Sequence, residues 1–348
     1  MIVLLLPLVA AILLFVAPPP RYTPRPAPNN LQQILYQRLS DAGLSGDELA
    51  TVGALTLGYK EDLDKDLLRH FRASGAAHVL AVSGLHTGII YALLIWLLTL
   101  GGRFRPRYEN RFGRWTVSLV IIIAMWGYAW LTGLTPSVVR AVLMVTVFET
   151  GRMAYRQAFS LNTIATAAFL ILLFHPTDLW SVSFQLSFTA TTAIVIIARK
   201  AEYFIHSRDW DISRKGRILS WIVGTIIISV AAQLGTLPLT MFYFHQISNY
   251  FLLTNLIVLP VATFLVPCGL ATVALGGTPV GLIIGKITHF LAWTMNHAVE
   301  WIENLPGSTA YVEINLPMVF LYYALLLGFL ILWSLKRKKK HVSTNKFA

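Results

Sequence analysis

Residues 75–88 are the part of this sequence that is richest in groups capable of chemistry. Polar residues and glycines interrupt an apolar run here: His78, Ser83, Gly84, His86 and Gly88. Ser83 and His86 would suit a nucleophile and its base, but no acid that could orient the histidine stands nearby. His78 and His86 are separated by more than two helical turns, too far to share a metal ion on one straight helix. We therefore predict no catalytic residue and no metal ligand, and interpret the stretch as pore-lining or helix-packing.

Gly84 and Gly88 are four residues apart, which permits either close approach of another helix or local unwinding. Six further polar or helix-distorting residues stand in apolar sequence: Arg140, Gln185, Gln233, Pro238, Asn255 and Pro260. Polar groups inside a bilayer usually face a cavity or the interior of a bundle. We include all of these residues as candidates for a pore or substrate path.

Each of these candidates has an alternative interpretation. Arg140 follows a proline turn and would either extend outward to the interface or present a cation to a passing anion. The three amides are typical of hydrogen bonds between helices as well as of ligand contacts. Pro238, Pro260 and Pro267 are expected to kink or break their helices and to free backbone carbonyls.

Composition indicates that the elements holding these residues are membrane helices. The chain has 348 residues, of which 56% are apolar and 13% charged, and its mean hydropathy is +0.63, so it has too little polar surface for a soluble globule. Apolar runs of about 20 residues without strict alternation predict helices rather than a barrel. We expect an all-α polytopic membrane protein with about nine to ten transmembrane helices, some broken by Pro or Gly. The nine strongest spans lie near 76–100, 116–132, 137–150, 158–175, 183–198, 218–243, 251–274, 280–302 and 316–335.

Four parts of the chain are expected. Residues 1–17 are an N-terminal membrane anchor, and residues 18–75 are a short extracytoplasmic helical segment that lies in the interface or packs on the bundle. Residues 76–335 are a polytopic channel domain, and residues 336–348 are a basic cytoplasmic tail. The apolar N-terminus is interpreted as a retained helix rather than a cleaved signal, because it has no basic start and no small-residue cleavage site. The chain has one cysteine, so an intrachain disulfide and a thiolate metal cluster are excluded, and no cofactor is expected.

The distribution of positive charge predicts the orientation of the chain. The net charge is +12, and most of the 28 basic residues stand in every second connector or in the tail, at 101–115, 151–157, 199–217 and 336–346. The connectors between these carry none. By the positive-inside rule the basic loops and the C-terminus are cytoplasmic, so residues 75–88 lie at the outer side. The span at 280–302 carries several polar residues, so it either crosses or lies in the interface; the basic run at 336–340 favours crossing.

Three motif blocks follow one another at Leu55–Gly58, Phe71–Gly75 and His78–His86, and further blocks stand at 132–140, 183–188 and 233–260. In these blocks the chain resembles the ComEC competence family, which passes single-stranded DNA across the bacterial inner membrane during natural transformation. The resemblance implies single-stranded DNA as substrate, a DNA-receptor protein outside and a helicase-like ATPase inside. No phosphate-binding Gly-x-x-x-x-Gly-Lys-Ser/Thr loop occurs here, so the motor would be a separate protein.

Two departures from the family pattern shape this expectation. The segment 18–75 is too short for the outer OB-fold domain of full-length relatives, and no His-x-His-x-Asp-His run of their nuclease-like domain is present. We therefore expect the membrane core alone, in contact with lipid and able to form a homo-oligomer. The alternatives are an inactive truncated member, a secondary transporter of a small solute or lipid, and an intramembrane hydrolase built on Ser83 and His86.

Overall fold

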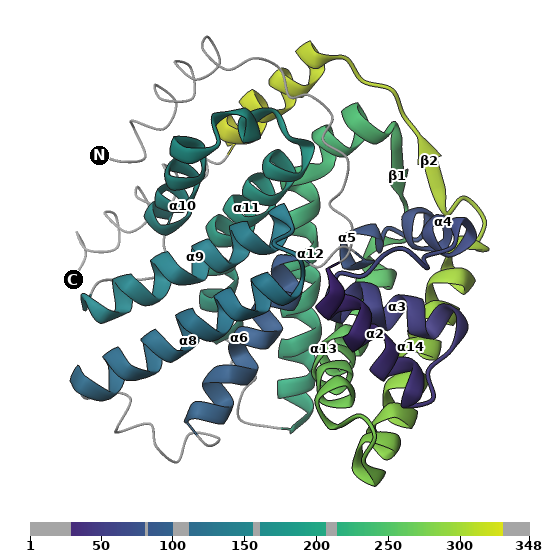
Figure 1. The fold of residues 1–348 in the computed structure, drawn as a ribbon. Helices are drawn as coiled ribbons and strands as arrows, with labels where there is room; N and C mark the ends of the chain where they lie inside the picture. The colour runs from purple at the N-terminus through teal and green to yellow at the C-terminus, as the bar shows by residue number, and fades with distance from the viewer. Residues whose placement is uncertain (1–28, 81–82, 100–110, 156–160, 207–213, 330–348) are drawn as a thin grey trace.

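The computed structural model describes residues 29–80, 83–99, 111–155, 161–206 and 214–329 (Figure 1). The predicted anchor at 1–17 and the predicted tail at 336–348 lie outside the described residues. Within them the chain is helical, apart from one pair of three-residue strands. The expected all-α fold is therefore confirmed.

The elements follow the predicted spans closely. In chain order they are α2 (Asn30–Asp41), α3 (Gly46–Leu57), α4 (Lys65–Ala73), α5 (Ala77–Leu80), α6 (Gly84–Leu98), α8 (Arg111–Leu131), α9 (Pro136–Met153), α10 (Leu161–Phe174), η1 (Pro176–Trp180), α11 (Val182–His206), α12 (Arg214–Phe244), β1 (Gln246–Ser248), α13 (Phe251–Leu275), α14 (Pro279–Glu303) and β2 (Thr309–Tyr311). A C-terminal helix covers Leu316–Phe329. Strands β1 and β2 pair antiparallel, which joins the connector after α12 to the connector after α14.

Three described helices are long and apolar enough to cross a membrane: Phe112–Leu131, Gly216–Phe244 and Phe251–Leu275. Four shorter apolar helices accompany them, in α6, α10, the first part of α11 and the C-terminal helix. Many large apolar side chains on these helices are exposed, as expected of surfaces that meet lipid. The total of nine to ten transmembrane helices stays a prediction.

The segment before residue 76 packs deeply into the helix bundle. Helix α3 contacts both α13 and α14, and every residue from Ala50 to Leu57 is buried. The hydroxyl of Thr51 donates to the side-chain oxygen of Asn296 at 2.9 Å, across the α3–α14 contact. One hydrophobic core contains residues from both sides of the predicted border at 75 and 76. That border therefore does not separate two cores.

Five helices form a closed series of contacts that we call the helix ring: α6, α9, α11, α12 and α13. Each contacts the next, and α13 contacts α6 again. Helix α8 packs outside on α6 and α9, and α10 packs on α9 and α11 (Figure 1). A second, smaller core lies between α10 and α11, around Ile171, Phe184 and Phe188. The ring therefore joins the larger core, on α6 and α13, to the smaller one on α11.

Of the two effects expected of the prolines, a kink or a break of their helices, the break does not occur. Helix α12 continues through Pro238, and α13 continues through Pro260 and Pro267. Because Pro238 has no N–H, the carbonyl of Leu234 loses its helical partner. The hydroxyl of Tyr322, on the C-terminal helix, donates to that carbonyl at 3.0 Å. A tertiary contact thus satisfies the acceptor, and the helix continues.

Candidate functional site

The histidine-bearing stretch is discontinuous and does not form a single span. Helix α5 ends at Leu80, and α6 begins at Gly84 with Ser83 as its N-cap in an extended conformation. The Ser83 hydroxyl accepts from the backbone N–H of Leu85 at 3.3 Å, and the N–H of Ser83 donates to Nδ1 of His86 at 3.1 Å. This reciprocal arrangement is a capping box with histidine in the place of the usual Glu or Gln.

The capping box explains why Ser83 and His86 lie together without requiring catalysis. The Ser83 hydroxyl and Nδ1 of His86 are 3.1 Å apart, within reach of a nucleophile and its base. However, Nδ1 already accepts the Ser83 N–H, so a neutral imidazole carries its proton on Nε2. Among the described residues this buried Nε2 has no hydrogen-bond partner. An acid that would orient the ring is therefore absent from this part of the structure, and His78 instead bonds the carbonyl of Gly75.

Within the described residues, Gly84 and Gly88 are not packed against another helix. Both are exposed, and a Cβ added at either would meet no heavy atom of this part of the chain within 4 Å. The described helices therefore do not make the close approach that the glycine spacing permitted. Instead, the exposed face of α6 has almost no side-chain bulk near its N-terminus, beside the cap formed by Ser83.

Arg140 points into the bundle, so the outward orientation considered from sequence is wrong. It lies on α9 with only 3% of its surface exposed, and it donates to the hydroxyl of Ser183 on α11 at 2.5 Å. Its Nε and Nη1 are buried and have no partner among the described residues. The α9–α11 contact in the helix ring thus contains a cation with two unused donors.

The three amides have different surroundings. Gln185 uses both ends of its side chain, donating to the carbonyl of Leu179 at 3.0 Å and accepting from the hydroxyl of Tyr243 at 2.9 Å. It therefore acts as an interhelical hydrogen-bond residue. Gln233 lines a mostly apolar pocket of about 350 Å³ between α12, β1 and the start of α13. The side-chain oxygen of Asn255 is buried on α13 without a partner among the described residues.

The structure therefore distributes the predicted residues around the helix ring and does not gather them at one point. Ser83 caps α6, which contains His86; Arg140 belongs to α9, Gln185 to α11, Gln233 to α12 and Asn255 to α13. Every ring helix carries at least one of these polar groups. Pro238 and Pro260 lie inside α12 and α13. Within the described residues no three His, Cys, Asp or Glu side chains are grouped as a metal site would require.

Glu149 is a buried polar residue that the sequence interpretation missed. Its carboxylate, on α9, is fully buried and accepts from Tyr91 of α6 and Ser118 of α8 at 2.5 Å each, and from Arg152 at 3.1 Å. The signal for it was present in the sequence: it is the only acidic residue between Glu109 and Asp178. Because its partners come from three helices, we interpret Glu149 as a structural group.

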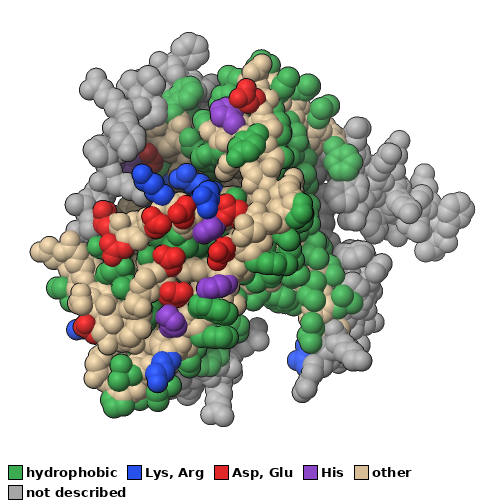
Figure 2. All heavy atoms as spheres, turned by 90° about the vertical axis from the view of Figure 1, so that its right-hand side faces the viewer, with side chains coloured by type: hydrophobic (Ala, Val, Ile, Leu, Met, Phe, Trp, Pro, Cys, Tyr) green, Lys and Arg blue, Asp and Glu red, His purple; other side chains and the backbone are tan. Residues whose placement is uncertain are grey.

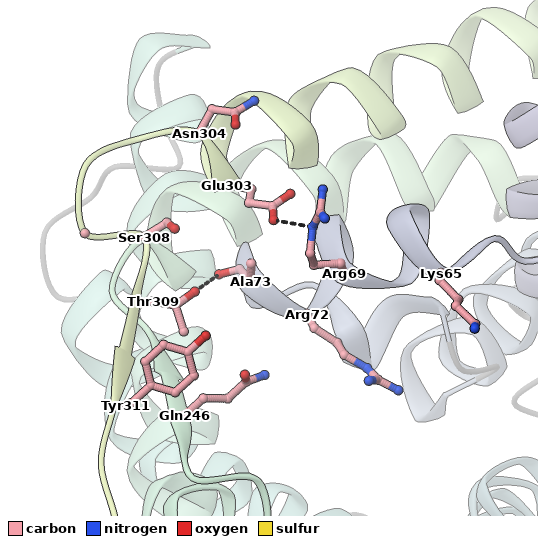
Figure 3. A pocket seen from close by; sticks show the side chains of 11 residues that line it. Lys65, Arg69, Arg72, Ala73, Gln246, Glu303, Asn304, Ser308, Thr309 and Tyr311 are labelled. Atoms are coloured by element: carbon pink, nitrogen blue, oxygen red, sulfur yellow. Dashed lines mark hydrogen bonds and ion pairs between the residues drawn. The ribbon is translucent and has the colours of Figure 1, made fainter.

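A polar pocket of about 550 Å³ lies between α4 and the β1–β2 pair (Figure 3). Its lining combines cations, amides, hydroxyls and one carboxylate: Lys65, Arg69, Arg72, Ala73, Gln246, Glu303, Asn304, Gly307, Ser308, Thr309 and Tyr311. Figure 2 shows charged and histidine side chains gathered on this side of the molecule, bordered by hydrophobic surface. The sequence interpretation did not include this pocket, because its two walls are far apart along the chain.

Comparison with known proteins identifies the family. The Competence protein family profile matches residues 55–337. The chain belongs to this family. It is 28% identical over 277 residues to ComE operon protein 3 of Bacillus subtilis, covering 79% of this chain and 32% of the relative. It is 26% identical over 300 residues to Recombination protein 2 of Haemophilus influenzae, covering 84% and 36% respectively.

A third relative is itself named a competence protein. Competence protein ComA of Neisseria gonorrhoeae is 31% identical over 159 residues, covering 45% of this chain and 22% of the relative. The chain spans about a third of the length of the Bacillus and Haemophilus relatives. No solved structure matches it. The resemblance to competence proteins is therefore confirmed, and the membership, together with three apolar helices of spanning length, indicates a membrane protein.

Proposed function

We propose that this membrane protein is a channel component that moves single-stranded DNA into the cytoplasm during natural transformation. The observation that carries the proposal is the helix ring of a chain from the Competence protein family. Each of its five helices carries at least one polar group, and Arg140 and Asn255 have buried atoms without a partner among the described residues. Polar groups inside membrane bundles are costly and usually mark a path for a polar solute. A transported strand needs such groups, because its phosphates and base edges lose water inside the membrane.

The ring supplies groups of the types that such a path needs. Arg140 has two buried donors that are free to meet a phosphate, and Asn255 has a buried acceptor that is free to meet a base. Gly84 and Gly88 leave open space beside these helices. We propose that the strand enters from the outer side, where a DNA-receptor protein delivers it. A helicase-like ATPase would draw it from the cytoplasm, with the chain multi-pass in the inner membrane and its C-terminus inside.

In this proposal the chain itself performs no catalysis and holds no metal or cofactor. It meets lipid at the exposed apolar faces of its helices, and a homo-oligomer would leave the ring inside each protomer unchanged. The short α5, the Ser83 cap and the start of α6 would then form the outer entrance.

A transformation assay on a deletion strain tests this function. Cells lacking the gene should bind labelled DNA outside but should not bring labelled strand into the cytosol, and the wild-type gene on a plasmid should restore entry. Unchanged uptake by the deletion strain would refute the proposal. The assay should follow the DNA itself as well as counting transformants, because a loss of recombination alone also lowers that count.

A secondary transporter of a small solute or lipid is the second candidate, because α5 and α6 form a discontinuous helix of the kind that such transporters use. The same deletion strain separates the two functions. A transporter defect would leave DNA entry intact and change the uptake of a small solute.

A further inference from the structure

We propose that the pocket between α4 and the β1–β2 pair binds one or two nucleotides of an incoming single strand, holding its phosphates by Lys65 and Arg72 and stacking a base on Tyr311. We call it the α4 pocket. The inference rests on the proposed function and deepens it, because it assigns the first contact of the substrate to specific residues. These residues lie outside the helix ring.

The cations of the α4 pocket come from one face of one helix. Lys65, Arg69 and Arg72 are spaced by four and three residues, so their side chains share a face of α4. All three line the pocket, where only one carboxylate, Glu303, faces them. Three cations against one carboxylate leave a positive charge of two on the lining.

Arg69 is already committed to acidic partners, but Lys65 and Arg72 are not. Arg69 bonds Glu303 at 3.0 Å and Asp66 at 3.0 Å, and Glu303 also pairs with His70. Among the described residues the side chains of Lys65 and Arg72 form no ion pair. Their charges are therefore available to phosphates, while Arg69 fixes Glu303 and keeps that carboxylate away from them.

Tyr311 gives the pocket an aromatic surface, the second component of a site for single strands. It lies on β2 with 82% of its surface exposed, and in Figure 3 its ring lies near Gln246, with Lys65 on the opposite side of the view. An exposed aromatic ring and cations within one groove are the combination by which single-stranded nucleic acids are held, with bases on the rings and phosphates on the cations. The amides of Gln246 and Asn304 add donors and acceptors for base edges.

The lining favours a nucleic acid strand over an anionic lipid. The pocket volume of about 550 Å³ is within the range of ligand sites, about 300–1,000 Å³. Apart from Ala73 and the ring of Tyr311, the lining side chains are polar or charged, so an acyl chain would find almost nothing to pack against. Those polar groups match a sugar–phosphate strand with its bases.

The pocket also lies next to elements that adjoin the ring. Strand β1, which contributes Gln246, directly joins α12 to α13, two of the ring helices. The next two residues of β1, Ile247 and Ser248, line the pocket that contains Gln233. The hydroxyl of Thr309 bonds the carbonyl of Ala73 at 3.4 Å, only a few residues before α5. A strand leaving the α4 pocket therefore meets the proposed entrance next.

Binding of a labelled oligothymidylate to the full chain tests this site. The chain is placed in nanodiscs of zwitterionic lipid, and binding is followed by fluorescence anisotropy over a series of salt concentrations. The double variant Lys65→Ala/Arg72→Ala should weaken binding by about tenfold at low salt. It should also reduce the slope of log K against log salt by about 1.4, because each phosphate contact with a single strand contributes about 0.7.

Matched variants separate the two parts of the site. Arg38→Ala/Lys286→Ala also removes two exposed cations, but neither lines the pocket, so binding and slope should stay at the wild-type values. Tyr311→Leu should weaken binding by about tenfold without changing the slope, and Tyr311→Phe should restore it, because stacking needs the ring and not the hydroxyl. Equal losses in the pocket and control variants would overturn the proposal.

One further outcome distinguishes a pocket that binds a DNA strand from a pocket that binds lipid. Another distinguishes failure of the α4 pocket proposal from failure of the proposed function. If Lys65→Ala/Arg72→Ala lowers only the amount of anionic lipid retained on purification and leaves oligonucleotide binding unchanged, the pocket is a lipid site and the proposal is wrong. If the deletion strain loses DNA entry but both pocket variants bind and restore entry like wild type, the α4 pocket is refuted while the proposed function stands. Normal entry in the deletion strain refutes the function itself.

Discussion

Helix α9 carries a buried charge at each end, and the two charges have very different surroundings. Near its C-terminal end, Glu149 accepts hydrogen bonds from three side chains of three helices. Near its N-terminal end, Arg140 donates to a single hydroxyl and has two buried nitrogens without a partner among the described residues. Both are charges inside apolar sequence, and the sequence interpretation singled out only Arg140.

This difference shows that the number of partners, more than burial, separates a structural charge from a candidate functional one. A buried charge whose hydrogen-bonding capacity is used holds helices together, and removing it leaves its partners unsatisfied. A buried charge with unused donors costs stability in the resting protein. A protein is expected to bear this loss of stability where a bound ligand, or water that the ligand displaces, accepts the remaining hydrogen bonds of the charged group.

The largest expected effect is at the Glu149 end. Glu149→Ala should lower the free energy of unfolding by about 3–5 kcal/mol, because the hydroxyls of Tyr91 and Ser118 lose their acceptor and Arg152 loses its carboxylate. The measurement is a denaturant titration of the purified chain in detergent micelles. Glu149→Gln keeps one acceptor oxygen and should lose less than Glu149→Ala. If Glu149→Ala is as stable as the wild type, the number of hydrogen-bond partners does not identify a structural charge in this protein.

The next prediction compares a glycine in a tight helix contact with a glycine on an open helix face. It extends the comparison from buried charges to the room available for a side chain. A Cβ at Gly235 of α12 would lie 2.8 Å from the backbone oxygen of Thr189 on α11, whereas a Cβ at Gly88 would meet none of the described atoms within 4 Å. Gly235→Ala should therefore cost about 1–3 kcal/mol through overpacking. Gly88→Ala should leave the free energy of unfolding unchanged, or raise it by up to about 1 kcal/mol through helix propensity. Equal effects of the two substitutions would contradict the open space at Gly88.

A smaller effect is expected at Ser83, and it separates a capping role from a catalytic one. Ser83→Ala removes the N-cap of α6 and should cost about 1 kcal/mol. Ser83→Asn keeps a capping oxygen but has no nucleophilic hydroxyl, so stability and DNA entry should both return to near wild type. If Ser83→Asn folds like wild type but loses all activity, Ser83 is a nucleophile and the channel interpretation of this residue is wrong.

Local sequence patterns predicted most of the fold, because apolar runs and charge-bearing connectors are properties of neighbouring residues. The helix positions and the polar character of residues 75–88 followed from such patterns. They left open whether residues 18–75 lie in the interface or pack on the bundle, and they did not predict that α3 contacts α13 and α14, because those contacts join residues far apart in the sequence. They also did not predict the hydrogen bond that Tyr322 donates to the carbonyl of Leu234, which Pro238 leaves without its helical partner, because the two residues are 88 positions apart. The α4 pocket was missed for the same reason, since it joins Lys65 to Tyr311.

The smallest expected change in stability, with a large change in function, is at the Arg140 end. Arg140→Met replaces the guanidinium by an apolar chain of similar length. It loses one hydrogen bond to Ser183, worth about 0.5–1.5 kcal/mol, but it also removes two buried donors that have no partner in the described structure. These two effects offset each other, so the free energy of unfolding should change by less than about 1 kcal/mol.

DNA entry should nevertheless fall strongly in Arg140→Met cells, because the variant cannot offer a cation to a phosphate inside the ring. Arg140→Lys keeps the charge and should retain more entry than Arg140→Met, which separates the charge from the shape of the side chain. The measurement is the uptake of labelled strand into the cytosol at matched protein levels in the membrane. If Arg140→Met is as destabilising as Glu149→Ala and entry falls only in proportion to the protein remaining, Arg140 is a structural charge like Glu149. The contrast between the two ends of α9 would then carry no information about function.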